Sequence, residues 1–187
     1  FDPREYLVGG NWLRTAQTLP LEDPSTGVQV GEIARCGQAE VDAAVAAATA
    51  ALDGPWGRMS AAERGRILMA MGRIVEDRVD ALAELEARDV GKPLTQARAD
   101  AKALARYLEF YGGAADKLMG ETIPYLDGYT VYTLREPHGV TGHIVPWNYP
   151  MQIIGRSVGA ALAMGNACVL KPAEEACLTA LAFADLA

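Results

Sequence analysis

Residues 140–172 of the chain read VTGHIVPWNYPMQIIGRSVGAALAMGNACVLKP, and this stretch decides the fold. It opens with an apolar, β-branched segment at 140–145 and closes with a second short apolar segment at 168–170, both typical of strands. Between them, apolar residues recur at helical spacing from Met151, and Gly165 followed by Asn166 is a typical helix stop. Strand, helix and strand in this order predict a right-handed crossover between two parallel strands.

Polar peptides follow both predicted strands, at residues 146–148 (PWN) and residues 171–174 (KPAE). Because open α/β sheets bind ligands at the carboxyl ends of their strands, we expect both peptides to face one crevice. Lys171 and Glu174 offer a donor and an acceptor to the vicinal hydroxyls of a ribose, and the carboxylate disfavours a 2′-phosphate, which favours NAD over NADP. Asn148 supplies a neutral amide donor of the kind that stabilises an oxyanion.

These residues also have purely structural interpretations. Asparagine is a preferred helix N-cap, and proline is favoured in the first helical turn. If the helix begins at Pro150, the cap falls at Tyr149 and Asn148 stays free; if Pro150 is the second helical residue, Asn148 is the cap. Lys171 and Glu174 could likewise form an ordinary surface ion pair that contributes little to stability.

The rest of the chain reads as short strands followed by helices. A glycine turn at 9–10 separates two short strands, and residues 28–34 alternate as a strand. Ser60 and Glu63 have the spacing of a capping box at the start of a helix. Further strand and helix patterns predict helices at about 40–52, 60–77, 79–87 and 95–112, and a strand at 129–135. We interpret these helices, which are rich in small residues, as a scaffold that does not contact the reacting centre.

Composition narrows the classes of function. The chain of 187 residues predicts one domain, or at most a domain with an appendage. Its 17 basic and 24 acidic residues give a net charge of -7, unlike a nucleic-acid or anionic-membrane binder. There is neither a bilayer-length apolar run nor a basic-then-apolar leader. Three cysteines without metal-like spacing favour a reduced, cytosolic compartment and no metal site. The chain starts at Phe1 and stops inside an apolar, helical run at 178–187, so we expect a part of a longer polypeptide.

With these residues in place, the chain resembles the aldehyde dehydrogenase superfamily. The resemblance is carried by two blocks, 142–150 (GHIVPWNYP) and 165–174 (GNACVLKPAE), whose separation also fits the family. Upstream, residues 23–27 (DPSTG) and 40–45 (EVDAAV) are similar to its N-terminal region. The likeness thus runs over nearly the whole chain, and the combination of the two blocks is more specific than either block alone.

The resemblance implies a Rossmann-like open α/β sheet with flanking helices. Residues 1–187 would be the N-terminal part of the cofactor-binding domain, residues 129–140 would be part of a β-hairpin oligomerisation flap, and the catalytic domain would lie outside the chain. Asn148 would donate a hydrogen bond to the oxyanion of a cysteine thiohemiacetal. The cofactor cleft would be lined by Ile144, Val145, Pro146 and Trp147, and Lys171 and Glu174 would hold the adenosine ribose together with Pro172 and Ala173 of the same segment.

By the same resemblance, the complete enzyme would oxidise a small aldehyde to a carboxylic acid with NAD, or with NADP, as a homodimer or homotetramer. The nucleophilic cysteine and the general-base glutamate of the family lie beyond residue 187, so this segment alone is expected to be inactive. Of Cys36, Cys168 and Cys177, only Cys177 lies at a predicted helix start, which can lower a thiol pKa, and none of the three is expected to be the nucleophile. Many family members have a lysine where this chain has Ser157, beside Arg156.

Two rival functions stay open from the sequence. One is a truncated, non-catalytic module that binds a nucleotide or assists assembly, which fits the length better and the two blocks worse. The other is a reductive relative that acts on acyl phosphates or acyl-CoA through the same thioester chemistry. The 171–174 block favours the oxidative enzyme.

Overall fold

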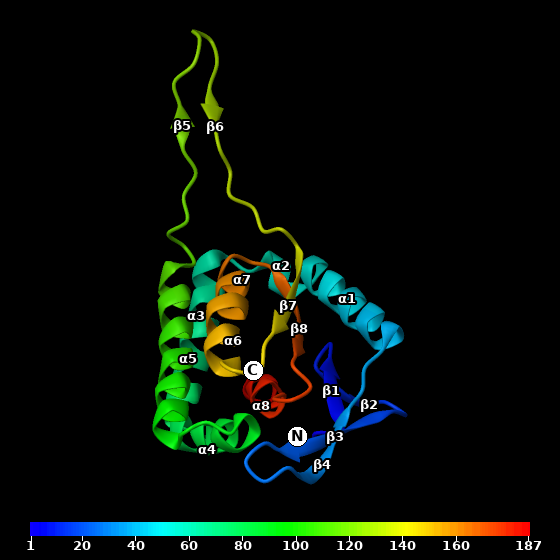
Figure 1. Cartoon of the computed structure of the whole chain (residues 1–187). Coiled ribbons are helices and arrows are strands. Elements are labelled where there is room, and N and C mark those ends of the chain that lie inside the picture. The colour runs from blue at the N-terminus through cyan, green and yellow to red at the C-terminus, as the bar shows by residue number, and fades with distance from the viewer.

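Two parallel strands, β7 (Val140–Val145) and β8 (Ala167–Pro172), lie at the centre of the molecule (Figure 1). The structure is a computed structural model that describes residues 1–187. The connection between the strands is helical and consists of α6 (Pro150–Ile154), a π-helical turn η1 (Gly155–Gly159) and α7 (Ala160–Ala163). It ends at Gly165, whose φ of +88° is the left-handed conformation of a glycine helix stop. The predicted α/β class and the parallel crossover unit are confirmed.

Helices cover this unit from both sides. On one side, α1 (Gln38–Asp53), which is followed by the short α2 (Pro55–Arg58), packs against both parallel strands. On the other side, the α6–η1–α7 segment separates the strands from the long helices α3 (Ala61–Asp77) and α5 (Leu94–Ala114), and α4 (Val79–Val90) packs against α5 at the bottom of the view (Figure 1). The main core lies between these layers and includes Leu68, Val75, Leu104, Leu108, Val145, Met151 and Ile154.

The long helices begin and end close to where the sequence predicts. The Ser60 hydroxyl accepts from the Glu63 N–H at 3.3 Å and the Glu63 carboxylate accepts from the Ser60 N–H at 2.8 Å, which completes the predicted capping box of α3. The chain breaks at Arg78 between α3 and α4, and α4 ends at Gly91 in the left-handed conformation. The last helix, α8 (Leu178–Leu186), packs against α4 and α6 and confirms the helix predicted from its apolar sequence.

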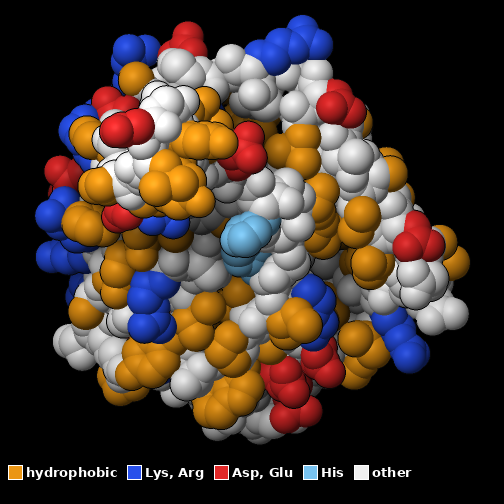
Figure 2. Space-filling model, turned by 90° about the horizontal axis from the view of Figure 1, so that it is seen from above, with side chains coloured by type: hydrophobic (Ala, Val, Ile, Leu, Met, Phe, Trp, Pro, Cys, Tyr) orange, Lys and Arg blue, Asp and Glu red, His pale blue; other side chains and the backbone are white.

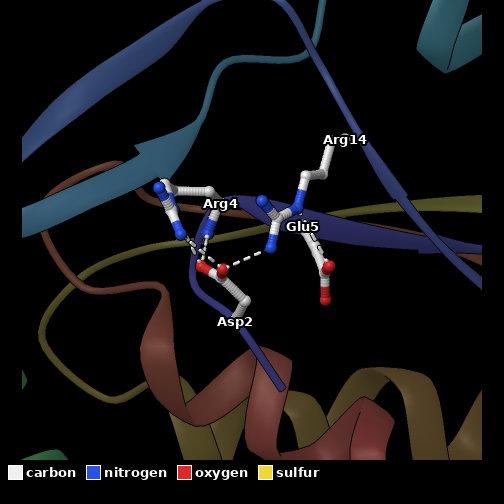
Figure 3. A network of polar contacts seen from close by, with 4 residues as sticks. All are labelled: Asp2, Arg4, Glu5 and Arg14. Carbon is white, nitrogen blue, oxygen red and sulfur yellow. Dashed lines mark hydrogen bonds and ion pairs between the residues drawn. The ribbon is translucent and has the colours of Figure 1, made fainter.

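The N-terminal residues form two antiparallel hairpins. β1 (Glu5–Val8) pairs with β2 (Asn11–Arg14) across the predicted glycine turn, and β3 (Thr18–Asp23) pairs with β4 (Val28–Ala34). Asp2 joins the first hairpin by accepting from Arg4 and Arg14, and Arg14 also contacts Glu5 (Figure 3). The two arginines are exposed and the two carboxylates are partly exposed, so the cluster orients the N-terminus but contributes little to stability.

A long hairpin rises from the body between α5 and β7 (Figure 1). Only β5 (Thr122–Ile123) and β6 (Val131–Tyr132) are paired in it, so the strand predicted for 129–135 is too long. Figure 2, which looks down on the side from which the hairpin rises, shows hydrophobic side chains spread widely over it. On the hairpin itself the exposed hydrophobic residues are Leu118, Met119, Ile123, Tyr125, Leu126, Tyr129, Tyr132 and Leu134. None of the helices of the chain is long and apolar enough to span a bilayer.

Candidate functional site

The carboxyl ends of β7 and β8 lie side by side. In the parallel register, Ile144 is opposite Lys171 and Val145 is opposite Pro172. The loops that leave the two strands therefore start from adjacent points on one edge of the sheet, which is where open α/β sheets bind ligands. β8 extends through Pro172, so Lys171 and Pro172 belong to the strand itself and do not follow it. The structure thus brings together the two peptides that the sequence singles out.

Asn148 has a free side chain. α6 begins at Pro150 and its N-cap is Tyr149, so the structure shows the arrangement in which Asn148 does not cap the helix. Asn148 is exposed, and its amide makes no hydrogen bond within the chain. A primary amide in this position can donate two hydrogen bonds to a ligand without breaking any interaction of the fold.

The four residues predicted to line a cofactor cleft divide between the surface and the core. Ile144 is 83% exposed and Trp147 is 56% exposed, and Pro146 is exposed between them. Val145 is 1% exposed and points into the main core, because successive side chains of a strand alternate between its faces. Ile144, Pro146 and Trp147 therefore form an exposed apolar surface at the strand end, whereas only the backbone of Val145 can reach a ligand there.

Lys171 and Glu174 contact each other across the end of β8. The Lys171 Nζ lies 3.1 Å from the Glu174 Oε2, and both side chains are 59% exposed. The backbone N–H of Glu174 and the ammonium of Lys171 together hold the pKa of the Glu174 carboxyl below its usual value, so it is ionised at neutral pH. Ala173 between them is buried and bridges to Ala176, which fixes the turn. A solvated pair of this kind is worth little to the fold and is available to a polar ligand.

A buried charge cluster that the sequence analysis missed lies beneath the Asn148 loop. The Lys92 Nζ is 2.6 Å from the Glu86 Oε1 and 2.8 Å from the Asp100 Oδ2, and all three side chains are almost completely buried. The second Glu86 oxygen accepts from the Met151 N–H at 3.3 Å, and the second Asp100 oxygen accepts from the Gln152 amide at 2.6 Å. The sequence analysis missed this cluster because charged residues at helical spacing usually indicate a solvated helix face. The one signal in the sequence that could have indicated burial is the position of Lys92 between Gly91 and Pro93.

This cluster predicts a pH dependence of stability. Burial raises the pKa of Glu86 to about 7, against the lowering effects of Lys92 and the Met151 N–H, and Asp100 adds repulsion. Because the pKa is higher in the folded state than in the unfolded one, the favourable contribution is complete below the unfolded pKa and is lost as the pH rises through about 7. From about pH 6 to about pH 8, the free energy of unfolding should fall by about 1 kcal/mol more in the wild type than in Glu86→Gln. Urea unfolding of both proteins at both pH values measures this difference. An equal change in the free energy of unfolding in the wild type and in Glu86→Gln would contradict the prediction.

The cysteines of the chain are not poised as nucleophiles. Burial raises the pKa of all three thiols, and the pKa of Cys177 rises to about 12. Since the thiolate is the reactive form, the raised pKa lowers the reactive fraction of each thiol at neutral pH, and Cys168 and Cys177 are also partly or fully buried. Ser157 lies in the π-helical turn, and its hydroxyl donates a hydrogen bond to the Ile153 carbonyl at 2.7 Å, within the same helical segment. Arg156 beside it is exposed and pairs with no carboxylate.

A parallel crossover unit with polar groups at the ends of both strands defines a class of α/β proteins that bind ligands at the sheet edge. The model of the aldehyde dehydrogenase family matches residues 12–187. The chain therefore belongs to the aldehyde dehydrogenase family, as the resemblance in the sequence implied.

Individual relatives agree with this assignment. The chain is 44% identical to hydroxyisobutyraldehyde dehydrogenase of Mycolicibacterium austroafricanum, over 98% of this chain and 37% of the relative. Among solved structures, a putative aldehyde dehydrogenase from Burkholderia cenocepacia superposes with a TM-score of 0.95 at 63% identity, over 98% of this chain and 39% of that one. PnpE in complex with nicotinamide adenine dinucleotide superposes with a TM-score of 0.94 at 35% identity, over 100% of this chain and 38% of PnpE. The chain thus spans little more than a third of the length of these relatives.

Proposed function

We propose that this chain is the part of an NAD(P)-dependent aldehyde dehydrogenase that holds the dinucleotide and supplies one donor for the substrate oxygen. The proposal is supported above all by one observation: a free asparagine amide and an exposed lysine–glutamate pair leave adjacent ends of two parallel strands. Two of the solved structures that match the chain contain NAD. They are those of PnpE and of betaine aldehyde dehydrogenase from Staphylococcus aureus. The nucleophilic cysteine belongs to a part of the enzyme outside residues 1–187.

The residues present fit a dinucleotide. The exposed apolar side chains of Ile144, Pro146 and Trp147 offer a surface for an aromatic or sugar group, and Lys171 and Glu174 offer a donor and an acceptor to ribose hydroxyls. A bound NAD would supply the acceptor for the hydride that leaves the substrate. Glu174 is ionised, so it would repel the 2′-phosphate of NADP and supports NAD as the preferred cofactor.

The chemistry assigned to this chain is electrostatic. As a nucleophile adds to the aldehyde carbonyl, negative charge develops on the oxygen, and the Asn148 amide would donate a hydrogen bond to it there. A neutral donor stabilises that oxygen without introducing a charge that would need its own partner. The raised pKa values of the three thiols support this division of labour, in which residues 1–187 bind and orient while another segment attacks.

Assembly and location are proposed on the same basis. Residues 129–140, with the preceding strand β5, would form an oligomerisation flap, because the hairpin exposes a row of apolar side chains that a second copy of the enzyme can cover. Three cysteines that form no disulfide support a reducing compartment such as the cytoplasm. A small aldehyde is the proposed substrate.

The proposed function is tested by incubating the complete enzyme with each of a panel of aldehydes, together with either NAD or NADP, and measuring the reduced cofactor that forms. Aldehyde-dependent reduction, with NAD preferred, is the expected result. The rival is a non-catalytic nucleotide-binding module. It would be the better account if the purified protein bound NAD without oxidising any aldehyde.

Removing either member of the pair at the end of β8 should weaken cofactor binding. Lys171→Ala and Glu174→Ala should each raise the Kd for NAD about tenfold, since each removes one charge-assisted hydrogen bond. Glu174→Ala should also narrow the difference between NAD and NADP. Calorimetric titration measures both, and Glu175→Ala at the adjacent exposed carboxylate is the matched control. If the control weakened NAD binding as much as the two variants, the pair would have no specific role.

A further inference from the structure

The buried charge cluster lies directly against the segment that follows Asn148. Its members come from three places in the chain: Glu86 from α4, Lys92 from the connection between α4 and α5, and Asp100 from α5. All three meet at the first turn of α6, within four residues of Asn148. The three residues are hereafter called the α6 anchor.

The α6 anchor contacts three of the four residues after Asn148. Glu86 accepts the Met151 N–H, and Asp100 accepts the side-chain amide of Gln152. The Lys92 ammonium lies 4.7 Å from the centre of the Tyr149 ring, in the position of a cation–π contact. Tyr149 is held from its other end, because its hydroxyl oxygen is 2.7 Å from the Gln96 amide, which donates to it.

The composition of the anchor argues against a role in stability alone. Two buried carboxylates share one ammonium, so one negative charge of the cluster has no cation of its own. A buried ion pair is often no better for stability than apolar residues of the same volume. What such a cluster does supply is geometry, because charge-assisted hydrogen bonds are short and directional.

Other residues must fix the position of the Asn148 side chain. Its side chain has no partner in the chain, so its position depends on the backbone that carries it. That backbone is tied to β7 on one side and to the first turn of α6 on the other. The first N–H groups of a helix have no partner within the helix, and the Glu86 carboxylate binds one of them.

We propose that Glu86, Lys92 and Asp100 are positioning residues for Asn148, and that they fix the first turn of α6 so that the Asn148 amide points at the substrate oxygen. The inference rests on the proposed function for the role of Asn148. It assigns to α4 and α5 a part in the chemistry, where the sequence had indicated only scaffold.

The test is a double-mutant cycle in the complete enzyme, with Glu86→Gln made both in the wild type and in Asn148→Ala. Glu86→Gln keeps the shape of the side chain and removes its charge. In the wild type it should lower kcat about tenfold or more, as expected for a displaced catalytic group, with the Kd for NAD within about twofold. In the Asn148→Ala background, where there is no amide left to position, it should change kcat by less than about twofold. An equal loss in both backgrounds would overturn the proposal, because a purely structural defect acts whether or not Asn148 is present.

Two further variants keep the test decisive. Gln152→Met removes one contact to Asp100 and no charge, so it serves if Glu86→Gln fails to fold, with the same non-additivity expected. Asp80→Asn is the matched control, because Asp80 pairs with Arg98 at 2.7 Å across the same two helices at the surface. Asp80→Asn should leave kcat unchanged. A tenfold lower kcat in this variant would show that any disturbance between α4 and α5 lowers activity, and it would contradict a specific role of the α6 anchor.

A readout independent of activity separates this proposal from the proposed function. Hydrogen exchange measured by mass spectrometry should be faster across residues 147–152 in Glu86→Gln and in Gln152→Met, and unchanged across β8. Unchanged exchange in residues 147–152 would overturn the anchoring role even in an active enzyme. If the wild type oxidised no aldehyde, the proposed function would fail, and the exchange result would still decide whether the anchor orders this loop.

Discussion

Asn148→Ala in the complete enzyme should lower kcat by about 100- to 1000-fold while the Kd for NAD stays the same. This is the loss expected when one donor to a developing oxyanion is removed, about 2.7–4 kcal/mol of transition-state stabilisation. Cofactor binding should not change, because the proposed contacts of the dinucleotide are with the strand ends and the Lys171–Glu174 pair. Steady-state kinetics with a good aldehyde substrate and titration with NAD measure the two effects.

The structure makes the control for Asn148 unusually clear. Asn148 is exposed, caps no helix and has no hydrogen-bond partner, so its removal should not change the thermal unfolding midpoint. Asn148→Asp keeps the shape and replaces the donor by a negative charge, and it should lose at least as much activity as the alanine variant. A full kcat in Asn148→Ala, or a large fall in its unfolding midpoint, would contradict the assigned role.

The sequence predicted best the elements that local residue preferences determine. β4 and β7 begin and end at the predicted residues, because each is a short run rich in β-branched residues that pairs with a neighbouring strand. The helix start at Pro150 was one of two open alternatives, and only the backbone conformation of Tyr149 distinguishes them. The proximity of the two polar peptides followed from topology alone, since parallel strands end at the same edge.

The elements that the sequence did not predict depend on contacts between distant residues. The alternation at 129–135 is typical of a strand, yet only Val131 and Tyr132 pair, because the hairpin stands away from the body and buries neither face. The π-helical turn at Gly155–Gly159 leaves no mark in the apolar periodicity. There, a Cβ on Gly155 would lie 2.9 Å from the Tyr107 ring, so the path of the helix follows from its packing on α5.

The charges of the α6 anchor were missed for a related reason. A lysine and two carboxylates near helix ends look like a solvated face, and their burial follows only once α4, α5 and α6 are packed together. Val145 was correctly placed on its strand but was assigned to the cofactor cleft with its neighbours. Alternation along the strand places its side chain in the core instead.

The packing of α3 against α5 leads to the second large effect, which concerns stability. Gly65 on α3 faces Gly112 on α5, and the absence of side chains lets the two backbones approach closely. A Cβ added at Gly112 would lie 2.8 Å from the Gly65 carbonyl oxygen, which is backbone and cannot rotate away, and 2.8 Å from the Met69 Cγ. Gly112→Ala must therefore separate two helices that enclose the main core.

Gly112→Ala should lower the free energy of unfolding by about 3 kcal/mol, at the upper end of the usual cost of overpacking. The adjacent glycine provides the control, since a Cβ on Gly113 would have no atom within 4 Å. Gly113→Ala should leave stability unchanged or raise it by up to about 1 kcal/mol, because alanine is the better helix former. Urea unfolding followed by circular dichroism compares the two variants. Equal effects of the two substitutions would mean that α3 and α5 do not meet at this glycine pair, and the core built on their contact would then need a different explanation.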